Sequence, residues 1–201
     1  TPICKASFTV PSGYVPELID KAVAIATEGR PGPVHLDLPI AMSAQLHDFE
    51  SVTYRRPPAI VAPAEGYNLT TAKEWLSKAE RPLIIAGVDA VNQGASKALT
   101  TFANKFGTPV ISTYKAKGII ADDEDLSLGG AGLSPLGDRK LIPLVEQSDF
   151  ILLVGYDPIE MRSGWRSIWN ISEKNVVELL AAPEYSFMHK SSISFICDIT
   201  E

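Results

Sequence analysis

The stretch Leu83-Ile84-Ile85-Ala86 is a short, continuous apolar run, typical of a strand that is buried on both faces. A second apolar run, Val110-Ile111-Ser112, follows at a distance that leaves room for one helix. Between the two runs, apolar residues recur at helical spacing until Gly107: Ala95, Ala98, Leu99, Phe102, Ala103 and Phe106. Strand, helix and strand in this order predict a βαβ unit with parallel strands.

The same pattern continues toward the C-terminus. Further apolar runs cover residues 150–154, 176–180 and 193–197, and a helical pattern with Leu141 and Val145 precedes the first of them. The capping-box pattern Thr71-Ala72-Lys73-Glu74 predicts the start of a helix before Leu83, and residues 114–138 are expected to form a long Gly-rich loop. Residues 69–201 are therefore predicted to be a Rossmann-like α/β domain, an open parallel sheet with helices on both faces.

The N-terminal part has a separate pattern. Residues 15–28 show the apolar spacing of a one-faced helix, with Pro16 at a plausible first position and Gly29 as its end, and residues 34–38 read as a strand. Too few residues precede this helix and strand to build a sheet for them. We therefore expect residues 1–45 to be the C-terminal piece of another α/β domain, and the proline-containing residues 46–68 to be a linker.

Composition excludes several classes of partner. The chain has 201 residues and a formal net charge of −6, without a block of Lys or Arg, so neither nucleic acid nor an anionic membrane surface is an expected partner. Cys4 and Cys197 stand far apart, which gives no disulfide framework and no zinc-site spacing. No signal-peptide pattern and no apolar run of bilayer-spanning length occurs. A cytoplasmic location is the expectation.

Ligands of open parallel sheets bind beyond the carboxyl ends of the strands, so three loops are candidates for a site. After Ala86, Asp89 stands where a dinucleotide fingerprint has its second glycine, which argues against a diphosphate at that turn. In the Gly-rich loop, Gly130 and Gly132 either form a flexible turn or allow the main chain to approach a flat ligand closely.

The third loop, residues 155–165, is the richest in polar groups. Here Asp157 is suited to accept a hydrogen bond from a ribose hydroxyl, and Arg162 is suited to bind a phosphate. The alternative is structural: Asp157 and Glu160 start a helix, Arg162 pairs with Glu160, and Trp165 and Trp169 belong to the core. The candidate cofactor-binding residues are thus Gly130, Gly132, Asp157 and Arg162. No nucleophile, base and orienting group come together, so no catalytic or metal-binding residue is predicted.

Several motifs in succession resemble thiamine-diphosphate-dependent enzymes that act on 2-oxo acids. The N-terminal piece, with Gly29-Arg30-Pro31-Gly32-Pro33-Val34, is similar to the end of their pyrimidine-binding domain. The segments similar to their central domain are Ala79-Glu80-Arg81-Pro82-Leu83-Ile84-Ile85-Ala86-Gly87, Phe102-Ala103, Gly107-Thr108-Pro109-Val110, Thr113 with Lys117-Gly118, and Ser148-Asp149-Phe150. Within the family, Gly155-Tyr156-Asp157-Pro158-Ile159-Glu160 and Gly130-Ala131-Gly132-Leu133 look most like acetolactate synthases.

This resemblance implies a fragment of an oligomeric enzyme that decarboxylates and joins 2-oxo acids with thiamine diphosphate and magnesium. The family's cofactor-activating glutamate is expected before Thr1, and its magnesium-binding segment after Glu201. The chain alone is therefore expected to be inert, with a structural role for its central domain. Two alternatives stay open: a Rossmann-like module that binds FAD or ADP, and a decarboxylase of the same family that joins no second substrate.

Overall fold

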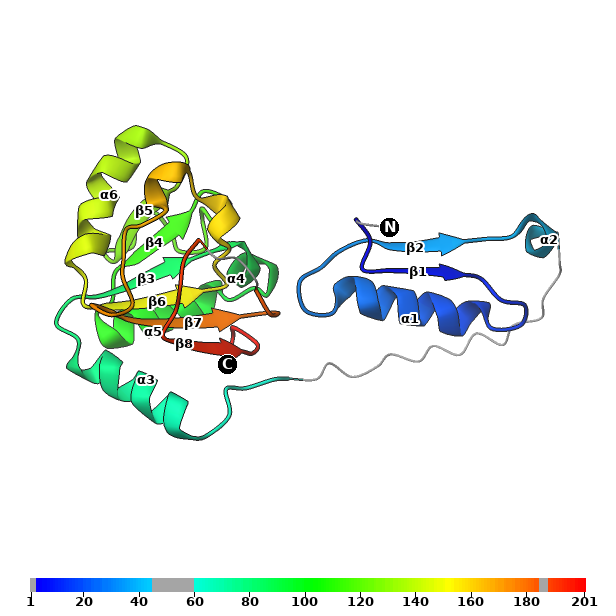
Figure 1. The fold of residues 1–201 in the computed structure, drawn as a ribbon, viewed down its shortest axis with the longest axis horizontal. Helices are drawn as coiled ribbons and strands as arrows, with labels where there is room; N and C mark the ends of the chain where they lie inside the picture. Colours follow the sequence, from blue (N-terminus) through cyan, green and yellow to red (C-terminus); the bar gives the residue numbers. More distant parts are fainter. Residues whose placement is uncertain (1–2, 45–59, 185–187) are drawn as a thin grey trace. The chain divides into compact units, whose positions relative to one another are not determined.

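The computed structural model describes residues 3–44, 60–184 and 188–201 (Figure 1). The chain divides into two compact units, Thr1–Ala59 and Ile60–Glu201. Most of the predicted linker, residues 46–59, lies outside the described residues, and the domain boundaries drawn from the sequence stay predictions. No helix among the described residues is long and apolar enough to cross a bilayer.

The first unit is a small βαβ arrangement. Strands β1 (Ala6–Thr9) and β2 (Val34–Asp37) pair in parallel, from Ala6 opposite Val34 to Thr9 opposite Asp37. Helix α1 (Val15–Thr27) joins them, and the short helix α2 (Ile40–Ser43) follows. The predicted helix and the predicted strand at residues 34–38 are confirmed. The expectation that too few residues precede them to build a sheet was wrong, because β1 pairs with β2. Strand β1 was missed because it has only four residues, of which two are partly buried and two are exposed, and so gives little periodic signal.

The second unit contains a parallel sheet of six strands in the order β5-β4-β3-β6-β7-β8. The strands are β3 (Pro82–Ala86), β4 (Val110–Thr113), β5 (Ser127–Ala131), β6 (Phe150–Val154), β7 (Asn175–Leu180) and β8 (Ile193–Ile196). The helices are α3 (Tyr67–Lys78), α4 (Val88–Asn92), α5 (Ser96–Phe106) and α6 (Pro135–Gln147). The predicted fold class, a Rossmann-like open parallel sheet with helices on both faces, is confirmed.

Two local predictions in this unit were wrong. The expected loop at residues 114–138 contains β5, an edge strand whose Gly129 and Gly130 hide the apolar pattern of a strand. Helix α3 begins after Gly66 rather than at Thr71, so the capping-box threonine lies inside the helix. The buried Ala72 and the partly buried Trp75 and Leu76 pack that helix on the sheet, which outweighs a local capping signal.

Two apolar clusters cover the two faces of the sheet. Alternate residues of β3 show the division, because Ile84 and Ala86 belong to one cluster while Leu83 and Ile85 belong to the other. Helices α3 and α5 pack on the first face and α6 packs on the second (Figure 1). The side chains of β3 from Leu83 to Ala86 are almost fully buried, as expected for a parallel sheet with both faces covered.

Candidate functional site

The carboxyl ends of β3, β4 and β6 are joined by a single side chain, Glu160. This residue ends the 3-10 helix η1 (Pro158–Glu160) after β6 and is only 1% exposed. Its Oε1 accepts a hydrogen bond from the backbone N–H of Val88, 3.2 Å away, and its Oε2 accepts one from the hydroxyl of Thr113. One carboxylate therefore fixes the loop after β6 to the turn after β3 and to the last residue of β4.

Burial raises the pKa of Glu160 above its ordinary value, because it disfavours the charged form. The hydrogen bonds from Thr113 and Val88 and the positive charge of Lys115 act in the opposite direction, while Asp157 adds to the rise in pKa. The site is thus a buried carboxyl group with two donors aimed at its oxygens. Such an arrangement is suited to holding loops together.

The turns after β3 and β6 are in direct main-chain contact. The N–H of Asp89 donates to the carbonyl of Gly155 at 3.1 Å, and a Cβ added to Gly87 would lie 2.5 Å from the Cα of Tyr156. Asp89 itself is 2% exposed. The turn where a dinucleotide-binding domain receives a diphosphate is therefore occupied by the protein's own backbone.

The structure brings two of the four candidate cofactor-binding residues together. Gly130 lies within β5, so the flexible-turn interpretation was wrong for it. Gly132 follows β5 with φ of 91°, its N–H donates to Asp138 Oδ1 at 2.8 Å, and its carbonyl accepts from the N–H of Arg162 at 3.3 Å. A Cβ at Gly132 would clash with Met161. The loop after β6 thus extends past the carboxyl ends of β3 and β4 to the end of β5.

The polar residues of that loop divide in their roles. Asp157 Oδ1 accepts from the N–H of Ile159 at 3.0 Å, so its predicted capping role is confirmed. The predicted pairing of Arg162 with Glu160 was wrong, because the Glu160 carboxylate is buried against Val88 and Thr113 while Arg162 is exposed. Whether Gly130, Gly132, Asp157 and Arg162 bind a cofactor stays a prediction.

Residues 69–201 match the sequence model of the thiamine pyrophosphate enzyme central domain. The chain belongs to this family. The match extends over two thirds of the chain and covers every strand of the six-stranded sheet.

Several curated relatives carry names from this family. The chain is 35% identical to glyoxylate carboligase of Escherichia coli O157:H7, over 66% of the chain and 22% of the relative. It is 29% identical to acetolactate synthase of Bacillus subtilis (89% and 31%) and 32% identical to oxalyl-CoA decarboxylase of Escherichia coli (72% and 26%). The chain thus spans less than a third of the length of these thiamine pyrophosphate enzymes.

A solved structure supports the fold. The chain aligns over its whole length with 38% of a Mycobacterium smegmatis protein described as a thiamin diphosphate-dependent enzyme, with a TM-score of 0.72 and 21% identity. This likeness concerns the fold alone.

The described part of the six-stranded unit fits neither the diphosphate of thiamine pyrophosphate nor a metal ion. Among the described residues, no three His, Cys, Asp or Glu side chains gather at one place where they could hold a metal ion. The turn after β3 is filled by backbone, and its Val88 N–H is bonded to Glu160. We therefore assign no catalytic step to these residues.

A second, partly buried polar cluster was not predicted from the sequence. The Tyr156 hydroxyl lies 2.8 Å from His189 Nδ1, and His189 Nε2 lies 2.5 Å from the carbonyl of Trp165. Because a carbonyl only accepts, Nε2 carries the hydrogen and Nδ1 accepts from Tyr156. Burial lowers the pKa of His189. Trp165 is fully buried, so its predicted core position is confirmed. Its hydrogen bond to His189 was missed because the two residues lie 24 positions apart and no local pattern connects them.

Proposed function

We propose that residues 69–201 are the structural central domain of a longer thiamine-diphosphate-dependent enzyme that decarboxylates 2-oxo acids and joins the product to a second substrate, as an acetolactate synthase does. In this role the domain orients the two catalytic domains and helps subunits of a cytoplasmic homo-oligomer to associate. Thiamine diphosphate and magnesium are held outside this chain, which is inert by itself.

One observation carries the structural role: the loop after β6 lies over the strand ends where a ligand would bind. Glu160 binds it to Val88 and Thr113, and the N–H of Arg162 binds it to Gly132. In these contacts the N–H groups of Val88 and Arg162 bond to the protein itself, whereas a nucleotide-binding loop would offer such groups to its ligand. They favour a rigid spacer over a ligand carrier.

The names of the relatives support the reaction class without choosing within it. They include a carboligase, a synthase and a decarboxylase, at 35%, 29% and 32% identity. The decarboxylase alternative therefore stays a candidate.

The test compares purified chain 1–201 with the longer polypeptide encoded by the same gene. Each is incubated with pyruvate, thiamine diphosphate and magnesium, and both carbon dioxide and acetolactate are measured. We expect no turnover from chain 1–201 and both products from the longer polypeptide. Turnover by chain 1–201 would refute the inert role, and carbon dioxide without acetolactate would favour the decarboxylase.

A nucleotide carrier is the rival function, because Gly132 and the exposed Arg162 lie at one edge of the sheet. Its test is the melting temperature of chain 1–201 with excess FAD and, separately, ADP, since a ligand that binds the folded state raises it. We expect no saturable rise. A rise that is lost in Arg162→Ala but kept in the matched control Arg166→Ala would replace the structural role by nucleotide binding.

A further inference from the structure

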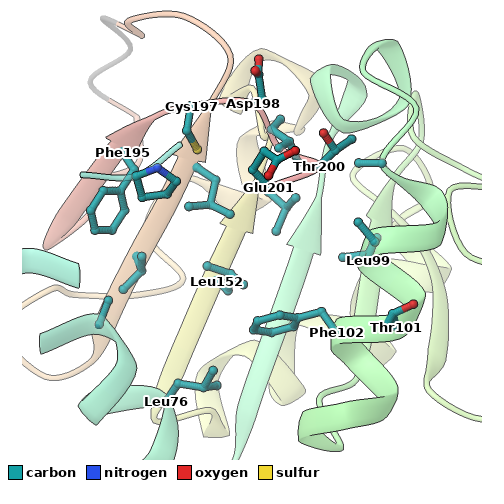
Figure 2. Close-up of a pocket in the computed structure, with 18 of the residues that line it drawn as sticks. Leu76, Leu99, Thr101, Phe102, Leu152, Phe195, Cys197, Asp198, Thr200 and Glu201 are labelled. Carbon is teal, nitrogen blue, oxygen red and sulfur yellow. The ribbon is translucent and has the colours of Figure 1, made fainter. Parts of the chain in front are cut away.

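An apolar groove of about 760 Å³ lies on the face of the six-stranded sheet that carries α3 and α5. Leu152 of β6 and Phe195 of β8 are on its floor, while Leu76 of α3 and Phe102 of α5 point into it from the sides (Figure 2). The other lining residues from the strands are Phe150, Val154, Val177 and Leu179. All of these residues belong to the second unit.

The topology explains why this face is open. Connections between parallel strands are right-handed, so strands added in opposite directions along a sheet place their connections on opposite faces. The chain steps from β3 to β4 in one direction, with α5 on the first face, and then from β6 to β7 to β8 in the other. The connections of these last strands pack beside α6 on the second face, through Trp165, Ile168 and Met188.

No crossover of this sheet can therefore cover β6, β7 and β8 on the first face. Parallel sheets are nevertheless found almost only with both faces covered. Helix α3 covers part of the face, and the groove remains between it and α5. An element that is not a connection of the sheet is needed to fill it.

The rim of the groove indicates the charge of that element. Lys73 of α3 and Lys97 and Lys105 of α5 line the groove and are exposed. The acidic lining residues are Asp198 and Glu201, which follow β8, so the cations are contributed by the helices (Figure 2). With the residues that the structure describes, none of these three ammonium groups forms an ion pair. Carboxylates of an incoming helix would meet three cations on this rim.

We propose that an amphipathic α-helix of the longer polypeptide, from outside residues 1–201, occupies this groove with its apolar face on Leu152 and Phe195 and its acidic flank on Lys73 and Lys97. The inference rests on the proposed function, in which the chain is part of a longer enzyme. The relatives leave ample length for such a helix, because the matched chain spans only 22% to 31% of them.

The experiment measures how fast a cysteine in the groove reacts with N-ethylmaleimide. Thr101 lines the groove on α5, whereas Asn104 is exposed on the same helix but does not line it. Thr101→Cys and Asn104→Cys are made separately, with Cys4→Ser and Cys197→Ala, in chain 1–201 and in the longer polypeptide. Both positions fall in the tryptic peptide 98–105, so one peptide reports both rates by mass spectrometry.

We expect labelling of Thr101→Cys to be about tenfold slower in the longer polypeptide than in chain 1–201, and labelling of Asn104→Cys to be unchanged. Adding Lys73→Glu should restore part of the lost rate, because it repels the acidic flank, while Lys140→Glu on α6 should not. Equal rates for Thr101→Cys in both proteins would overturn the proposal. Protection that disappears on dilution would also overturn it, since a second copy would then cover the groove.

The pyruvate assay separates the two proposals. A longer polypeptide that turns over pyruvate but leaves Thr101→Cys as reactive as in chain 1–201 would refute only the docked helix. Protection of Thr101→Cys in a polypeptide without any activity on pyruvate would refute the proposed reaction and keep the docked helix.

Discussion

The Glu160 carboxylate and the backbone N–H of Val88, 72 residues apart in the chain, are joined by a hydrogen bond of 3.2 Å. This bond fixes the loop after β6 to the turn after β3, and the bond from Thr113 fixes the same loop to the end of β4. A carboxylate so placed occupies an N–H group that could otherwise face a bound phosphate. Ligands of open parallel sheets bind at the carboxyl ends of the strands, and here the loops at these ends are bonded to one another.

Glu160→Ala is expected to lower the free energy of unfolding by about 2 to 4 kcal/mol, because it leaves the buried hydroxyl of Thr113 and the Val88 N–H without their acceptor. Urea unfolding of chain 1–201 measures the change. Glu124→Ala, at an exposed turn, is the matched control and should stay within about 0.5 kcal/mol of the parent. Equal effects of the two substitutions would contradict the bridging role of Glu160.

Gly87→Ala should destabilise the second unit by about 1 to 3 kcal/mol, because the added methyl group meets the backbone of Gly155 and Tyr156, which has no rotamer to adopt. Gly164→Ala is the control, since a Cβ there meets nothing within 4 Å. Thermal unfolding followed by circular dichroism compares the two variants. A Gly87→Ala protein as stable as Gly164→Ala would show that the turns after β3 and β6 can separate freely.

The sequence could predict the elements whose signal is local. Strands β3 and β6 are continuous apolar runs, and α5 ends at a glycine, so spacing alone located them. Strand β5 escaped because an edge strand pairs on one side only and tolerates glycines that read as a loop.

The contacts of the site could not be found in the same way. Of the two donors to the Glu160 carboxylate, the one nearer in the chain, Thr113, lies 47 residues away, and spacing within a loop favours the neighbouring Arg162 instead. Only the order of the strands in the sheet brings Thr113 and Val88 to this carboxylate. Long-range pairing is therefore what separates the predicted site from the observed one.

Acidification should loosen the contact between Tyr156 and His189. Burial holds the pKa of His189 below its ordinary value of 6.5, so the neutral ring stabilises the fold above that pH, and this stability is lost as the pH falls through the folded pKa. Urea unfolding from about pH 8 to about pH 5 should show decreasing stability, and His189→Gln should reduce the slope. An unchanged slope in His189→Gln would contradict the assignment of this pH dependence to His189. The matched control is His35→Gln in the first unit, for which we expect the slope of the parent.

Asp149 should account for a separate loss of stability at lower pH. Burial tends to raise the pKa of its carboxyl group, but hydrogen bonds from the N–H groups of Glu80 at 2.8 Å and Arg81 at 3.0 Å outweigh this and hold the pKa below 3.8. A lowered pKa stabilises the fold above the unfolded value, and the contribution is lost as the pH falls through the folded one.

Asp149→Asn should therefore cost about 1 to 2 kcal/mol at neutral pH, because an amide offers one acceptor oxygen where two backbone donors converge. The substitution should also reduce the dependence of the free energy of unfolding on pH between about pH 5 and pH 2, where the parent loses the stability that its carboxylate supplies. Asp123→Asn, at an exposed turn, should leave both quantities unchanged. If Asp149→Asn keeps the acid slope of the parent, other carboxylates cause that loss of stability.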